Sequence, residues 1–143
     1  MQFNVCMKRF LPFLLVIWSL EGLAQIEGED YFLHSIYFGG GSFYIDEQGA
    51  QDLYEFLDAI ENIENYSISI HGHTDNIGGV AYNEWLAEMR SETVIQLMEM
   101  HEIDREMITK KDFGLFNPLY DNSTWQGREL NRRVDIILWP ISM

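Results

Sequence analysis

The chain has 143 residues, which is enough for one domain and leaves little for a second. Hydrophobic residues make up 47% of it and aromatic residues 14%, so a sizeable core can form and wholesale disorder is excluded. The formal net charge is −14, and such an acidic surface argues against binding to nucleic acid or to anionic membranes. The single cysteine, Cys6, excludes a disulfide framework and a multi-cysteine zinc site.

Residues 1–24 have the pattern of a cleaved secretory signal peptide. Lys8 and Arg9 precede an apolar run, Phe10–Leu20, that is too short to span a bilayer as a helix. Gly22 and Ala24 place small residues where cleavage after Ala24 needs them. The alternative is an uncleaved anchor or a buried N-terminal helix. We therefore expect an exported domain that comprises residues 25–143.

The first part of this domain alternates between strand and helix patterns. Aromatic and β-branched residues over 31–38 predict a strand, and the glycines at 39–41 end it. Asp46 can cap a helix whose apolar residues recur at helical spacing, and Asn65 is expected to end that helix. Apolar and polar residues alternate over 66–71, which predicts a half-buried strand.

The second part continues the alternation. Residues 82–101 predict a helix with one broad apolar stripe, made of Tyr82, Trp85, Leu86, Met89, Val94, Leu97 and Met98. A strand over 108–113, a polar loop over 114–127, a helical turn over 129–131 and a last strand over 134–138 follow. The order β-α-β-α-β-β predicts an α/β (α+β) sandwich, with two main helices packed on one mixed four-stranded sheet.

The most polar loop, His73-Thr74-Asp75-Asn76, leads from the second strand into the second helix. Arg90 lies within that helix, about two turns after Asn83 and on roughly the same face. If the loop folds back over this face, Asp75 and Arg90 can approach each other. A carboxylate and a guanidinium that converge can hold a zwitterion, one binding its ammonium and the other its carboxylate. The alternative is a plain Asp75–Arg90 salt bridge that pins the loop.

Two further patterns carry potential chemistry. His71 and His73 have a spacing that can ligate zinc, as a metal-dependent hydrolase would require; the alternative is a histidine that hydrogen-bonds the loop. Arg132 and Arg133 are adjacent in a predicted strand, so one can face a ligand while the other pairs with acidic neighbours, or both can be solvated or paired. Because no nucleophile triad and no phosphate-cradling loop are present, we expect a non-enzymatic protein without a cofactor or metal.

Three spaced blocks of the sequence resemble OmpA-like C-terminal (peptidoglycan-binding) domains. The first block is Ile70-His71-Gly72-His73-Thr74-Asp75-Asn76-Ile77-Gly78. The second is Asn83 followed by Leu86-Ala87-Glu88-Met89-Arg90-Ser91-Glu92-Thr93-Val94. The third contains Gly114, Asn117-Pro118, Asn122, Thr124, Gly127-Arg128 and Asn131-Arg132-Arg133-Val134-Asp135-Ile136. The resemblance covers about residues 33–138, which we expect to be the core of the domain.

This resemblance implies a periplasmic domain that binds peptidoglycan noncovalently, through the diaminopimelate of the stem peptide. It implies that Asp75 binds the ammonium of this zwitterion and Arg90 its carboxylate. Thr74 and Asn83 would add hydrogen bonds and shape the loop, and Arg132 would be a second cation. Most members carry a membrane anchor, whereas this chain is expected to have none. It is therefore expected to act as a free domain or to dock on an outer-membrane or other envelope protein.

The sequence departs from the family pattern after the first strand. Gly39-Gly40-Gly41-Ser42 replaces a stretch that is usually polar, so any contribution of this loop is expected from its backbone N–H groups or from Ser42. The alternative function is a protein-interaction module of the envelope that keeps the fold without wall binding, helped by acidic helix faces.

Overall fold

The computed structural model describes residues 31–141, and the predicted signal peptide lies outside this range. The elements are β1 (Phe32–Tyr37), α1 (Glu47–Asp58), β2 (Tyr66–His73), α2 (Val80–Met100), β3 (Ile108–Gly114), α3 (Trp125–Asn131) and β4 (Arg133–Pro140). Short 3-10 turns at Ile63–Asn65 and Arg105–Met107 precede β2 and β3. The predicted order of strands and main helices is confirmed, and the predicted helical turn is the two-turn helix α3.

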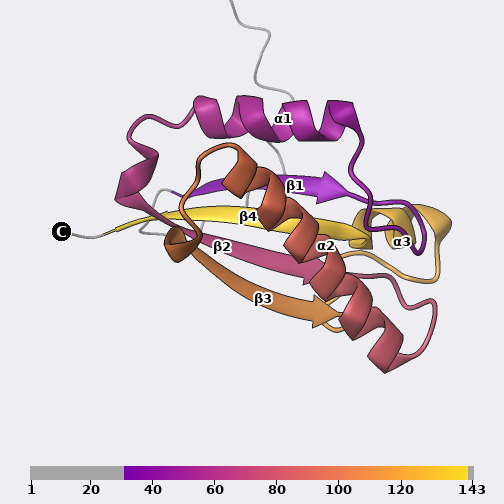
Figure 1. The fold of residues 1–143 in the computed structure, drawn as a ribbon. Coiled ribbons are helices and arrows are strands. Elements are labelled where there is room, and N and C mark those ends of the chain that lie inside the picture. Colours follow the sequence, from indigo (N-terminus) through magenta and orange to yellow (C-terminus); the bar gives the residue numbers. More distant parts are fainter. Residues whose placement is uncertain (1–30, 142–143) are drawn as a thin grey trace, which may run out of the picture.

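The four strands form one mixed sheet in the order β1-β4-β2-β3 (Figure 1). β2 and β3 are parallel and are connected through α2, whereas β4 is antiparallel to both β1 and β2. β1, β2 and β3 therefore end at the same edge of the sheet, where α3 lies and β4 begins (Figure 1). Loops that follow three strands meet at this edge, which is a common place for a functional site.

The helices α1 and α2 cover one face of the sheet and share one core. Leu53 of α1, Ile95 of α2, Ile70 of β2 and Ile136 of β4 are all fully buried in this cluster. Gly72 allows α2 to approach β2, because a Cβ at this position would lie 2.7 Å from the carbonyl oxygen of Ala87. The close approach sets the N-terminal half of α2 against the end of β2.

Two details of the helices differ from the sequence-based expectation. Asp46 caps α1 as predicted, by accepting a hydrogen bond from the backbone of Gly49, but α1 ends at Asp58 rather than near Asn65. The chain then reverses through Asn62, whose φ of 54° is left-handed and cannot continue a helix. The predicted apolar stripe of α2 is wrong at its N-terminal end, where Tyr82 and Trp85 are 44% and 46% exposed.

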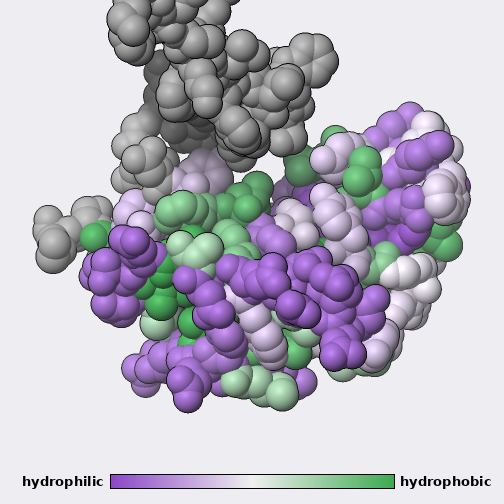
Figure 2. All heavy atoms as spheres, turned by 90° about the horizontal axis from the view of Figure 1, so that it is seen from above, coloured by the Kyte–Doolittle hydropathy of each residue, from purple (hydrophilic) through white to green (hydrophobic). Residues whose placement is uncertain are grey.

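Acidic residues dominate the outer surface of α1, as the charge predicts. Hydrophilic side chains run across the molecule when it is seen from the α1 side (Figure 2). They include the exposed carboxylates Glu47, Asp52, Glu55 and Asp58. Within residues 31–141, the helices are too short or too polar to cross a membrane.

Candidate functional site

A cleft of about 320 Å³ lies at the edge of the sheet where β2 ends. Its walls come from the loop after β1, the loop after β2, the first turns of α2 and the end of α3. The lining residues are Gly40, Gly41, Asp75, Ile77, Tyr82, Leu86, Arg90, Arg128 and Arg132. Three predicted site residues, Asp75, Arg90 and Arg132, are thus brought together although they are far apart in the sequence.

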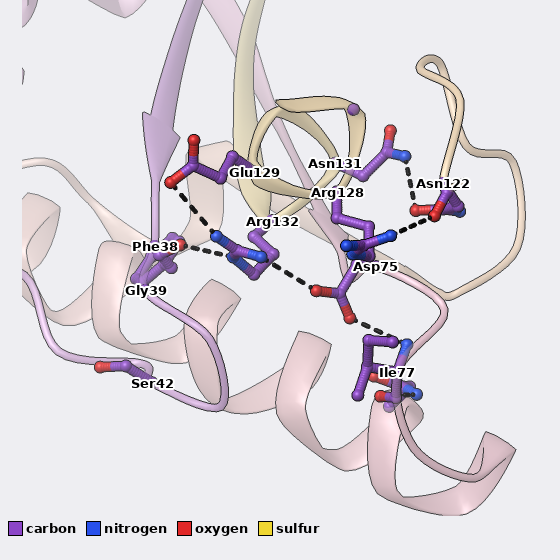
Figure 3. A network of polar contacts seen from close by, with 12 residues as sticks. Phe38, Gly39, Ser42, Asp75, Ile77, Asn122, Arg128, Glu129, Asn131 and Arg132 are labelled. Carbon is purple, nitrogen blue, oxygen red and sulfur yellow. Dashed lines mark hydrogen bonds and ion pairs between the residues drawn. The ribbon is translucent and has the colours of Figure 1, made fainter. Parts of the chain in front are cut away.

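Asp75 lies at the centre of a polar network in this region (Figure 3). Its Oδ1 accepts a hydrogen bond from the backbone N–H of Ile77 at 3.0 Å, which forms a local turn at the start of the loop. Its Oδ2 lies 3.1 Å from Nη1 of Arg132. Asp75 is 8% exposed, so both interactions fix a carboxylate that is largely shielded from water.

The ion-pair partner of Asp75 in the described chain is Arg132 and not Arg90, so the plain Asp75–Arg90 salt bridge is absent there. Arg132 is the C-cap of α3 and reaches the cleft from the opposite side to α2. Its Nε donates to the carbonyl of Phe38 at 3.1 Å, and its Nη2 lies 3.6 Å from Glu129. Arg133, the next residue, is buried and pairs with Asp135, so the two adjacent arginines do serve different sites.

Arg90 is fully buried in the wall of the cleft and is anchored by backbone carbonyls. Its Nε donates to Ser42 at 2.8 Å, its Nη1 to His73 at 3.1 Å and its Nη2 to Gly39 at 3.0 Å. Burial lowers the pKa of Arg90 to about 10, while the nearby carboxylate of Asp75 opposes this shift. Arg90 is therefore both a cation of the cleft and the clamp that joins the loops after β1 and β2.

The glycine loop after β1 positions Arg90 through its backbone. Its carbonyl oxygens, at Gly39 and Ser42, hold the guanidinium of Arg90. Gly41 has a left-handed φ of 65°, and a Cβ there would lie 3.2 Å from the hydroxyl of Tyr82. A side chain at Gly41 would thus be strained and would crowd the cleft wall.

Thr74 and Asn83 lie next to the cleft without lining it. The side-chain amide of Asn83 donates to the carbonyls of Ile77 and Gly79, which fixes the loop that carries Asp75. Its amide oxygen and the hydroxyl of Thr74 are buried without a hydrogen-bond partner among the described residues. Buried polar atoms of this kind are normally satisfied by water or by a ligand.

Arg128 lines the cleft and lies in the third motif, but it is not among the predicted site residues. Its Nη1 donates to the carbonyl of Asn122 at 2.9 Å, which orders the loop before α3 (Figure 3). With Arg90 and Arg132 it gives the cleft three cations against the one carboxylate of Asp75. A cationic cleft in a chain of net charge −14 is a local exception that favours a ligand with anionic groups.

The two histidines of the predicted zinc alternative have other partners. Nε2 of His71 lies 2.8 Å from the hydroxyl of Ser69. His73 is 6% exposed, stacks on Phe113 and lies 3.5 Å from Asp135. Within residues 31–141, no group of three or more His, Cys, Asp or Glu side chains is arranged to hold a metal ion.

The family model described as the OmpA family matches residues 37–132. The chain belongs to the OmpA family. The outer-membrane lipoprotein YfiB of Pseudomonas aeruginosa is 30% identical over 113 residues, which cover 78% of this chain and 67% of that protein. Outer membrane porin F of the same organism is also 30% identical, over 92 residues that cover 64% of this chain and 26% of the porin. The chain therefore corresponds to only about a quarter of porin F.

Solved OmpA-like structures have the same fold. The peptidoglycan-associated lipoprotein from Burkholderia pseudomallei superimposes with a TM-score of 0.68 at 23% identity, covering 73% of this chain and 88% of that one. The cell wall anchor of the type VI secretion system (T6SS) from Pseudomonas aeruginosa gives a TM-score of 0.64 at 23% identity, with 78% and 82% covered. The predicted family and fold are thus confirmed.

Proposed function

We propose that this domain binds peptidoglycan noncovalently and holds the free zwitterionic end of diaminopimelate in the cleft. The observation that carries the proposal is the convergence of one buried carboxylate and three guanidinium groups in a single cleft. An ammonium and a carboxylate on one carbon atom match this arrangement, because each charge meets its opposite within a few ångströms.

Asp75 is suited to bind the ammonium. A carboxylate offers about four acceptor positions. The N–H of Ile77 and the guanidinium of Arg132 use two of them, one on each oxygen. Each oxygen therefore retains a lone pair for an N–H of the ligand, and no existing interaction has to break.

Arg90 and Arg132 are suited to bind the carboxylate. A guanidinium has five N–H donors, and backbone carbonyls use three of those on Arg90, which holds its buried charge in the wall of the cleft beside the ligand's carboxylate. These carbonyls also prevent the guanidinium from moving, which lowers the entropy lost on binding. Arg132 approaches Asp75 to 3.1 Å and supplies the second cation. Thr74 and Asn83 keep the supporting role in shaping the loop.

Relatives support this function and the location that it requires. The structural neighbours include a peptidoglycan-associated lipoprotein and a cell wall anchor, and YfiB is named an outer-membrane lipoprotein. We infer that this domain works in the periplasm as an attachment module of the cell envelope and not as an enzyme. An outer-membrane or other envelope protein is its proposed second partner.

Sedimentation with insoluble peptidoglycan sacculi tests the proposal. Asp75→Asn removes the charge that holds the ammonium but keeps an oxygen for the N–H of Ile77. Asp104→Asn is a matched control, because Asp104 makes the same type of turn with the N–H of Glu106 and is exposed beyond the other end of α2. We expect wild type and Asp104→Asn to sediment with sacculi and Asp75→Asn to remain largely in solution.

A folded wild-type protein that stays in the supernatant would contradict wall binding. It would favour the alternative of a protein-interaction module, for which the acidic surface of α1 would be the first region to test. Equal sedimentation of Asp75→Asn and wild type would instead show that the wall is bound elsewhere.

A further inference from the structure

An exposed group of aromatic rings lies beside the cleft and has no role in the binding described above. Phe43, Tyr82 and Trp85 are 37%, 44% and 46% exposed, and we call them the aromatic platform. Phe43 meets Trp85 edge-on with 5.9 Å between ring centroids, and Tyr82 lies at the same distance from Trp85. Contiguous exposed aromatics, unlike single ones, commonly mark a binding surface.

The platform is continuous with the cleft through Tyr82. This residue lines the cleft, and its hydroxyl lies close to Gly41 in the opposite wall. Trp85 follows one turn later on α2, and Phe43 follows directly after the loop that Arg90 holds. A ligand that is anchored in the cleft can therefore extend over these rings.

The rings are arranged before any ligand arrives. Each contacts another ring of the platform, and two of them stand on the rigid first turns of α2. Tyrosine and tryptophan provide a large apolar area with few rotatable bonds, and each keeps a polar atom for a hydrogen bond. This combination suits a ligand with an apolar face and polar edges.

We propose that the aromatic platform binds a sugar ring of the glycan strand whose stem peptide occupies the cleft. The inference rests on the proposed function, because a stem peptide in the cleft is covalently attached to that glycan. The C–H face of a pyranose can stack on Trp85, and its hydroxyl and acetamido groups can reach water and the polar edge of Tyr82. The exposed carboxylates Glu84 and Glu88 on the same helix disfavour an anionic occupant but not an uncharged sugar.

Calorimetry with two ligands separates this proposal from the function on which it rests. The first ligand is the free stem tripeptide that ends in diaminopimelate, and the second is the same tripeptide joined to its disaccharide. Wild type is expected to bind the second more tightly by about two- to tenfold, which is the effect of one or two aromatic contacts. Trp85→Ala is expected to lose this difference while binding the free tripeptide like wild type.

Two further variants complete the test: one removes a second ring of the platform, and the other is a control far from it. Phe43→Ser removes a second ring from outside the helix and is expected to reduce the same difference. Met100→Ala removes an exposed apolar side chain, 76% accessible, from the opposite end of α2 and is expected to change neither affinity.

Three results would overturn the proposal. If Trp85→Ala keeps the full preference for the disaccharide ligand, the platform does not bind sugar. If it weakens both ligands equally, the platform contacts the peptide instead. If wild type binds neither ligand, the proposed function fails and the platform proposal fails with it.

Discussion

The two halves of α2 differ in what they bury. The C-terminal half, over residues 92–100, buries the apolar Val94, Ile95 and Met98 against the sheet. The N-terminal half, over residues 80–91, buries Asn83, Arg90 and Ser91 together with Leu86 and Ala87, and we call it the polar half. Both halves pack on the same sheet, but the apolar half completes the core and the polar half faces the ends of the strands. The buried residues of α2 therefore stabilise the fold at its C-terminal end and position the cleft at its N-terminal end.

The difference follows from what each half meets. Apolar side chains meet other apolar side chains, and their contribution comes from removing surface from water. The polar half meets the end of β2 and the loop after β1, whose backbone carbonyl groups need hydrogen-bond donors where they are shielded from water. Arg90 satisfies three such carbonyls and in return is held rigidly beside Asp75 and Arg132.

The largest effect is expected from Arg90→Ala, which tests whether the polar half also holds the fold together. It would remove the donor of three carbonyls, and leaving the buried carbonyl of His73 unpaired alone costs about 1–3 kcal/mol. The free energy of unfolding should therefore fall by about 2 kcal/mol or more. Urea denaturation measures this loss. Arg105→Ala, at an exposed arginine paired with Glu92, is the control and should unfold close to wild type. Equal urea midpoints for the two variants would mean that the hydrogen bonds of Arg90 contribute little to stability.

Arg132→Gln should weaken binding more than it weakens the fold. It removes one cation from the cleft and the charged hydrogen bond to Asp75. Because a hydrogen bond from a guanidinium to the carboxylate of the ligand contributes about 1.5–3 kcal/mol, binding to a diaminopimelate muropeptide should fall about tenfold or more. Lys111→Gln removes a positive charge from an exposed site on β3 and should leave the calorimetric affinity unchanged. Matching affinities for both variants would remove Arg132 from the site.

Ile95→Val tests the apolar half of α2. Ile95 is fully buried, and the loss of one methyl group should lower the free energy of unfolding by about 1 kcal/mol. Muropeptide affinity should stay at the wild-type value, because Ile95 does not line the cleft. A clear change in affinity would show that the two halves of α2 are not independent.

A pH dependence of stability is expected from His73, whose carbonyl is bound by Arg90. Burial, followed by the charge of Arg133, lowers the pKa of His73 to about 4 from a usual value of 6.5. Between these two pH values the unfolded chain binds more protons than the folded one. Stability contributed by neutral His73 is therefore complete above pH 6.5 and falls as the pH drops toward 4.

Thermal unfolding of His73→Gln between pH 7 and pH 4 checks this dependence. The variant should lose less stability across this range than wild type. A His73→Gln curve parallel to wild type would exclude His73 as a source of the acid sensitivity.

The order of strands and helices could be predicted from the sequence because these elements have clear local periodicity. α2 was predicted over 82–101 and extends over Val80–Met100, and the alternation over 66–71 lies within β2. Asp75, Arg90 and Arg132 could be singled out because they stand in spaced motifs. These signals are either local or carried by the resemblance to a family.

The partners within the cleft could not be predicted from such signals. The bond from Arg90 to Gly39 joins residues 51 positions apart, and that from Arg132 to Asp75 joins residues 57 apart. Tyr82 and Trp85 match the spacing of a core stripe, but at the end of α2 they extend beyond the sheet and remain exposed. Helical periodicity identifies the apolar face of a helix, but it does not indicate where the sheet that covers this face ends.

The central claim is that the cleft recognises both charges of the diaminopimelate end. The most direct test is calorimetric titration of the protein with two muropeptides, one with diaminopimelate and one with lysine at the same position. Lysine keeps the ammonium for Asp75 but lacks the carboxylate for Arg90 and Arg132. We predict saturable binding of the diaminopimelate ligand and a loss of at least about tenfold with lysine. Equal affinity for the two ligands would contradict the account, because the cationic side of the cleft would then have no part in recognition.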